Sequence, residues 1–144
     1  MSAAHGVALA VAYTWLGMVL AISFLEAPLK FRAEGVSLPI GLAIGRLVFR
    51  ALNYAEFLLA LTLIAALAAD RSTPAAVAGA VAIGTLAVQA VVVRPPLHRR
   101  SDAVLADPQD AALLATRSLA HHVYIALEVI KCVALLLAGI LLSV

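Results

Sequence analysis

Ionisable side chains interrupt long apolar runs of this chain, and this pattern most limits what the chain can fold into. Residues 41–69 and 111–143 are strongly apolar, yet both runs contain arginine or lysine together with glutamate. Burying an unpaired ionised group in an apolar environment is costly, and charged groups inside membrane helices tend to line a pathway or a ligand site. We therefore expect membrane-crossing helices that meet at a polar site.

The composition indicates a membrane protein. Of the 144 residues, 65% are hydrophobic and 12% are charged, and the mean hydropathy is +1.08. Soluble domains are about half apolar and about a quarter charged. The net charge of +2 is no indication of nucleic acid as a partner, because the basic residues fall mostly in or beside two loops. The expected surroundings are a lipid bilayer.

Hydropathy predicts an all-α, polytopic membrane protein that forms a single domain over residues 1–144. A membrane-crossing helix needs about 20 mostly apolar residues. The chain offers four such segments, at residues 5–27, 39–69, 74–93 and 111–144. The two prolines at positions 95 and 96 are expected to end the third helix, because proline continues a helix poorly.

The distribution of basic residues predicts the orientation. Lysine and arginine gather near residues 28–40 and 94–110, the second group including Arg94, whereas the opposite side offers only Arg71. The positive-inside rule then places both basic loops in the cytoplasm and both termini outside, in a bacterial inner membrane. Gly41 and Gly45 are expected to permit close helix approach. Helix faces rich in small residues leave surface to share, so we expect a homo-oligomer, specifically a dimer.

A weak internal similarity suggests a two-helix duplication. Residues 26–32 align with residues 94–100, which pairs Pro28 with Pro96, and an insertion of four residues then pairs Glu56 with Glu128. The hypothesis divides the chain into repeats 5–69 and 74–144. Because both repeats have the same expected orientation, their symmetry axis would lie along the membrane normal. Chance similarity between helices rich in alanine, leucine and valine is the alternative.

Helical periodicity groups the polar side chains of the second and fourth segments into stripes. At 3.6 residues per turn, neighbours three or four positions apart share a face. Glu26 adds a counter-charge from the end of the first segment. The candidate ligand-binding or pathway residues are Glu26, Arg46, Arg50, Asn53, Glu56, Arg117, His121, Tyr124, Glu128 and Lys131.

Two interpretations of these stripes stay open. In the first they join into one polar cavity on the cytoplasmic side. In the second they form interhelical ion pairs that only fix packing. Glu128 and Lys131 are three residues apart and can pair. No metal site is predicted, because His121 and Cys132 lie about 16 Å apart along the helix axis.

Two further side chains receive structural interpretations. His5 is expected to be solvated at the start of the first span. Trp15 is expected to be a packing or interface aromatic rather than a member of the site.

Two segments resemble a bacterial family of four-span membrane proteins of unknown function. They are residues 23–32, Ser-Phe-Leu-Glu-Ala-Pro-Leu-Lys-Phe-Arg, and residues 41–49, Gly-Leu-Ala-Ile-Gly-Arg-Leu-Val-Phe. Residues 119–124, Leu-Ala-His-His-Val-Tyr, would match that family's helix-opening Leu-His. The similarity spans most of the chain, and it implies four spans without an established chemistry.

A shorter segment resembles another family. Residues 50–57, Arg-Ala-Leu-Asn-Tyr-Ala-Glu-Phe, are similar to the Arg-Ala-x-x-Asn-x-x-Glu signature of the membrane-associated eicosanoid and glutathione metabolism family. That resemblance implies that Arg50, Asn53 and Glu56 hold glutathione between the subunits of a trimer. One residue is missing here between Ala51 and Asn53, which turns Arg50 by about 100° relative to the pattern.

The leading functional hypothesis is a non-enzymatic transporter or channel-like carrier for an ion or a small polar solute. Glu56 and Glu128 would be its embedded charged groups, with Arg46, Arg50, His121 and Lys131 as partners. Histidine changes charge near neutral pH, which suits proton coupling. The alternatives are a glutathione-binding membrane enzyme of the transferase or isomerase type and a structural or accessory membrane subunit.

Overall fold

The computed structural model describes residues 2–110 and 119–144, and all regular secondary structure in these two ranges is helical. Four continuous helical segments are long and apolar enough to cross a membrane, Ala3–Arg32, Leu38–Asp70, Thr73–Ala106 and Leu119–Ser143. The predicted all-α fold with four membrane spans is therefore confirmed.

Two of the spans contain changes of helix type. The first span consists of α1 (Ala3–Val19), the π-helix η1 (Leu20–Glu26), α2 (Ala27–Leu29) and the 3₁₀-helix η2 (Lys30–Arg32). The second span is α3 (Leu38–Asp70). The third consists of α4 (Thr73–Val88), the π-helix η3 (Gln89–Val93) and α5 (Arg94–Ala106). The described part of the fourth span is α7 (Leu119–Ser143).

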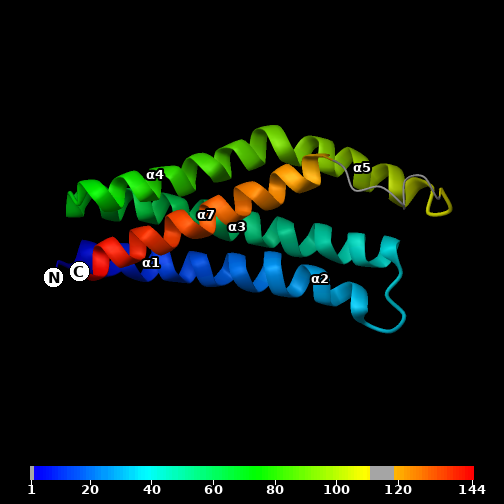
Figure 1. Ribbon diagram of the computed structural model, residues 1–144, viewed down its shortest axis with the longest axis horizontal. Helices are drawn as coiled ribbons and strands as arrows, with labels where there is room; N and C mark the ends of the chain where they lie inside the picture. Colours follow the sequence, from blue (N-terminus) through cyan, green and yellow to red (C-terminus); the bar gives the residue numbers. More distant parts are fainter. Residues whose placement is uncertain (1, 111–118) are drawn as a thin grey trace.

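The spans run alternately up and down in a four-helix bundle (Figure 1). The start of α1, the turn between α3 and α4 and the end of α7 lie together at one end, whereas α2 and α5 lie toward the other. In the bundle α1 packs against α3 and α7, and α4 packs against α7 and α3. This cyclic arrangement lets every span contribute side chains to one interior.

A histidine joins three helix ends at the end that holds both termini. His5 Nδ1 lies 3.1 Å from Asp70 Oδ1, and His5 Nε2 donates to the backbone oxygen of Leu142 over 2.6 Å. Ser2 Oγ accepts from the backbone N–H of His5 and donates to the same Asp70 oxygen. The expectation that His5 is solvated was therefore wrong, because its two partners come from α3 and α7, which only the assembled bundle places nearby.

The prediction that the prolines end the third helix was also wrong, because the helix continues through them to Ala106. The π-helix η3 ends at Val93, and α5 restarts at Arg94 with Pro95 and Pro96 in its first turn. Each proline removes one N–H from the helix, and here the prolines stand directly after the segment where the helix changes from π to α geometry. The first span passes Pro28 in the same way, directly after η1, and extends to Arg32 instead of ending at residue 27.

Small residues receive side chains from neighbouring helices, which brings the spans close together. A Cβ atom at Gly41 or Gly45 would lie within 3 Å of the side chain of Phe31 or Lys30, respectively. At Gly139 of α7 it would lie 2.7 Å from the ring of Tyr13 in α1. The expected close approach at Gly41 and Gly45 is thus present, and side chains of the first span make it. Large apolar side chains cover much of the outer surface, as a membrane-facing surface requires.

Candidate functional site in the bundle interior

One polar cluster occupies the interior of the bundle, and all four spans contribute to it. The first span supplies a tryptophan and a serine, α3 a glutamate, the third span a glutamine and an arginine, and α7 a tyrosine, a glutamate and a lysine. The members of this polar cluster are Trp15, Ser23, Glu56, Gln89, Arg94, Tyr124, Glu128 and Lys131.

Lys131 lies at the centre of the polar cluster and is fully buried. Its ammonium group donates to the carboxylate of Glu56 and, over 2.9 Å, to Gln89 Oε1. It also forms an ion pair with Glu128 Oε2 at 2.8 Å, so the predicted pairing of these two residues is confirmed. An ammonium group has three N–H donors. The hydrogen bonds to Glu56 and Gln89 use two of them, and the ion pair with Glu128 places a second carboxylate beside the ammonium group.

The carboxylate of Glu56 receives bonds from three different spans. Besides Lys131, the indole N–H of Trp15 donates to Oε1 over 3.1 Å. The guanidinium group of Arg94 lies 3.5 Å from Oε2. Glu56 is fully buried, and a carboxylate in such surroundings needs this number of donors to offset the water it has lost.

Glu128 has a different set of neighbours. The hydroxyl group of Ser23 donates to Oε1 over 2.5 Å, and the amide of Gln89 donates to Oε2 over 2.7 Å. The hydroxyl group of Tyr124 lies 3.5 Å from Oε1. Lys131 is therefore the cation that pairs with Glu128, whereas Glu56 has both Lys131 and Arg94.

The charges of the polar cluster balance. Glu56 and Glu128 carry two negative charges when ionised, and Arg94 and Lys131 carry two positive charges. Isolated charges in a low-dielectric interior cost many kcal/mol, and pairing with good hydrogen-bond geometry is what makes their burial tolerable. The cluster can thus lie inside a membrane protein with every charge compensated by a neighbour.

Helix geometry explains why these positions meet. Tyr124, Glu128 and Lys131 are four and three residues apart and therefore share one face of α7. Gln89 and Arg94 are five residues apart, which in an α-helix would turn them about 140° from each other. The π-helix η3 begins at Gln89 and ends one residue before Arg94, and its i to i+5 bonding brings positions five apart to about the same face. The local π geometry thus aims both side chains into the bundle.

The structure places several predicted site residues outside the polar cluster. Arg46 pairs with Asp102 of α5 at 2.6 Å in a partly exposed position. Glu26 pairs with Lys30 one turn along its own span, at 3.2 Å. Arg50 is exposed on α3. Helical periodicity correctly grouped side chains by face, but which face points inward depends on the neighbouring helices.

The remaining predicted residues have distinct positions. Asn53 is half-buried, and its Oδ1 atom is buried without a hydrogen-bond partner in the described part of the chain. His121 is half-buried near the start of α7 and has an interaction partner. Arg117 lies outside the described residues. Of the ten predicted residues, the polar cluster therefore contains Glu56, Tyr124, Glu128 and Lys131.

Sequence reasoning missed four members of the polar cluster. Gln89 stands as a lone amide within an apolar run, and this signal was available. Arg94 was assigned to a loop because two prolines follow it, and Trp15 was interpreted as a packing aromatic although its indole N–H needs a partner when buried. Ser23 offers no comparable signal, because a single serine is common in membrane helices.

Comparison of the chain with protein-family models, curated proteins and solved structures finds no match. Among the described residues, no group of three or more histidine, cysteine, aspartate or glutamate side chains is placed to hold a metal ion. In the polar cluster, the carboxylates of Glu56 and Glu128 share the ammonium group of Lys131.

Proposed function

We propose that this integral membrane protein is a small carrier or channel-like transporter for a proton or small cation, with the polar cluster as its exchange site. The observation that carries this proposal is the buried Lys131 shared by the carboxylates of Glu56 and Glu128. Ionisable groups at membrane depth are characteristic of ion pathways and proton relays.

The position of the cluster supports this function. Glu56 lies 14 residues before Asp70, the last residue of α3, which corresponds to about 21 Å along the helix axis. Glu128 lies 15 residues before Ser143, the last residue of α7, or about 22 Å. The hydrocarbon core of a bilayer is about 30 Å thick. Both carboxylates therefore lie well away from the end that holds the termini.

The shared lysine offers a simple way to take up one positive charge. When a proton or cation neutralises Glu128, Lys131 and Arg94 remain beside Glu56, and Lys131 no longer has to serve both carboxylates. When the charge leaves, Lys131 again pairs with Glu128. No step leaves an ionised carboxylate without a cation. While Glu128 is neutral, the cluster carries one net positive charge, which Lys131 and Arg94 share beside Glu56.

Opening of the site requires movement of the helices, because Glu56, Gln89 and Lys131 are fully buried. The π-helices η1 and η3 supply places where such movement can occur. Both contain a cluster member, Ser23 and Gln89 respectively, and π segments inside α-helices are frequent at functional sites. A change in either segment would turn a hydrogen-bonding side chain toward or away from Glu128.

The test is ion flux into liposomes that contain the purified protein. A potassium gradient with valinomycin sets the membrane potential, and dyes inside the liposomes report the entry of protons or sodium ions. We expect flux with the wild-type protein and its loss in the double variant Glu56→Gln with Glu128→Gln. Arg46→Gln is the matched control, because Arg46 forms an ion pair outside the cluster.

The outcome separates transport from a structural role. The charge balance and the hydrogen bonds of the cluster would also favour a structural role, so the cluster alone does not decide between the two. Absence of proton and cation flux with folded wild-type protein would leave the structural role. Equal flux in the wild-type protein and the double variant would show that these two carboxylates are not the exchange site.

The glutathione alternative has less geometric support. Both carboxylate oxygens of Glu56 are already bonded to Trp15, Lys131 and Arg94, whereas Arg50 is exposed on α3. Arg50 and Glu56, the first and last polar residues of the segment that resembles the glutathione motif, therefore do not face one shared binding site. Calorimetry with glutathione on detergent-solubilised protein tests the alternative directly, and measurable binding that Asn53→Ala abolishes would favour it.

A further inference from the structure

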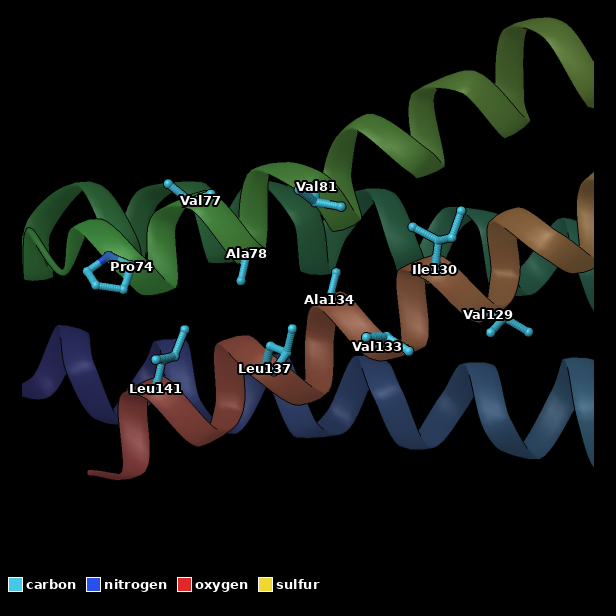
Figure 2. A pocket seen from close by; sticks show the side chains of 10 residues that line it. All are labelled: Pro74, Val77, Ala78, Val81, Val129, Ile130, Val133, Ala134, Leu137 and Leu141. Carbon is cyan, nitrogen blue, oxygen red and sulfur yellow. The ribbon is translucent and has the colours of Figure 1, made fainter.

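A groove on the surface of the bundle follows the line between α4 and α7 (Figure 2). Its volume is about 460 Å³. Side chains from the two helices face each other across it, and the small side chains Ala78 and Ala134 each point toward the facing helix. The lining is entirely apolar and consists of Pro74, Val77, Ala78, Val81, Val129, Ile130, Val133, Ala134, Leu137 and Leu141.

The chemistry of the lining restricts the occupant. A polar or charged ligand would lose its hydration in the groove and find no side-chain hydrogen bond to replace it. A hydrocarbon chain loses nothing on entering, and it gains close contacts with the branched side chains on both walls. The groove is also open to the surface of four spans that are apolar enough to cross a membrane, so lipid chains are its immediate neighbours.

The length of the groove matches one leaflet of a bilayer. On α7 the lining extends from Val129 to Leu141, which corresponds to about 18 Å along the helix axis. Half of the hydrocarbon core is about 15 Å thick. Pro74 and Leu141 lie at one end of the groove, and Val81 and Val129 lie at the other (Figure 2). A membrane-crossing helix from a second copy of the chain would pack along most of a span of about 30 Å, which is longer than this groove.

Positive charge near Pro74, at the end of the groove closest to the chain termini, favours an anionic headgroup. Arg71 lies in the turn between α3 and α4, three residues before Pro74, and is exposed. The neighbouring carboxylate of Asp70 is engaged by His5. The first turn of α4 begins at Thr73, and the positive end of a helix dipole also attracts negative charge.

We propose that the groove between α4 and α7 binds one acyl chain of an anionic glycerophospholipid, whose headgroup lies at the turn containing Arg71. This site is independent of the exchange site in the polar cluster. Its inner end nevertheless reaches Val129 and Ile130, the residues on α7 that directly follow Glu128 and directly precede Lys131. Occupation of the groove therefore holds α7 against α4 at the level of the polar cluster.

The test uses spin-labelled phosphatidylglycerol and phosphatidylcholine in membranes that contain the purified protein. Electron paramagnetic resonance measures the fraction of each lipid that the protein immobilises. Ala78→Leu fills the groove and should remove immobilised phosphatidylglycerol equivalent to a single lipid per chain. Ala65→Leu is the matched control, because Ala65 is exposed on α3 and does not line the groove. This control should leave the immobilised fraction unchanged.

A second variant tests the headgroup without altering the packing of the bundle. Arg71 has a left-handed backbone with φ 59°, which asparagine also tolerates. Arg71→Asn should lower the preference for phosphatidylglycerol over phosphatidylcholine about fivefold, the effect of a single basic residue near an anionic surface. An unchanged immobilised fraction in Ala78→Leu or an unchanged lipid preference in Arg71→Asn would overturn the proposal. Dissociation of an oligomer in Ala78→Leu would assign the groove to a second copy instead.

Discussion

Replacing Lys131 with methionine is the most informative single perturbation of the polar cluster. Methionine keeps an unbranched side chain of similar length but removes the ammonium group that Glu56, Gln89 and Glu128 share. Glu56 still faces Arg94 after this change. Glu128 keeps only neutral hydrogen-bond donors and becomes a buried carboxylate without a cation.

The expected loss of stability follows from the fact that Glu56 keeps a cation in the variant whereas Glu128 does not. Removing one partner of a buried ion pair costs about 3–5 kcal/mol, mainly because the remaining charge is left uncompensated. Glu128 can relieve part of this cost by binding a proton, so we expect a loss of about 3 kcal/mol for Lys131→Met. Adding Glu128→Gln removes the stranded charge, and the coupling between such neighbours is typically about 0.5–3 kcal/mol. The double variant should therefore be more stable than Lys131→Met alone.

The free energy of unfolding can be measured by circular dichroism in mixed micelles of a mild detergent and dodecyl sulfate. Arg46→Met is the control, since the ion pair of Arg46 with Asp102 is partly exposed and such pairs contribute about 0–1 kcal/mol. The reasoning fails if Lys131→Met costs no more than Arg46→Met, or if Glu128→Gln worsens the stability of Lys131→Met.

Three further substitutions test separate parts of the fold, the first and third by the same unfolding measurement and the second by amide hydrogen exchange. Trp15→Phe removes the indole donor to Glu56 and should cost about 1.5–3 kcal/mol, as expected for a hydrogen bond to a charged group; a cost near zero would mean that this bond is not formed. His5→Leu removes the contacts with Asp70 and Leu142 and should speed amide hydrogen exchange at the ends of α1 and α7. Equal exchange in the variant and the wild-type protein would argue that His5 does not hold these helix ends together. Gly139→Ala places a Cβ atom 2.7 Å from the ring of Tyr13 and should cost about 1–3 kcal/mol, and Tyr13→Leu should recover part of that loss.

Periodicity and hydropathy predicted the parts of the site that depend on a single helix. Tyr124, Glu128 and Lys131 share one face of α7 because a regular α-helix places positions three and four apart together. Glu56 was identified because it is the one acidic side chain in the strongly apolar residues 41–69. These inferences needed no knowledge of neighbouring helices.

The partners of these residues depend on contacts between spans. Arg46 was expected to serve Glu56 or Glu128, but it pairs with Asp102, because the third span continues as α5 and brings that carboxylate beside it. Arg94 reaches Glu56 for a related reason, since the π-helix η3 changes the direction of the side chains that follow it. A departure from regular helix geometry is invisible to arguments that assume 3.6 residues per turn.

The amino-acid sequence by itself determined the class of the protein and the number of its spans, because the cost of exposing backbone groups to lipid forces long apolar segments to become helices. It also determined that charges would lie inside the membrane, since they stand within those segments. Only the tertiary structure decided which charges meet. Lys131 is placed between Glu56 and Glu128 because α3 and α7 turn these faces toward the same interior, and that choice depends on how side chains such as Tyr13 and Phe31 pack against glycines of neighbouring spans.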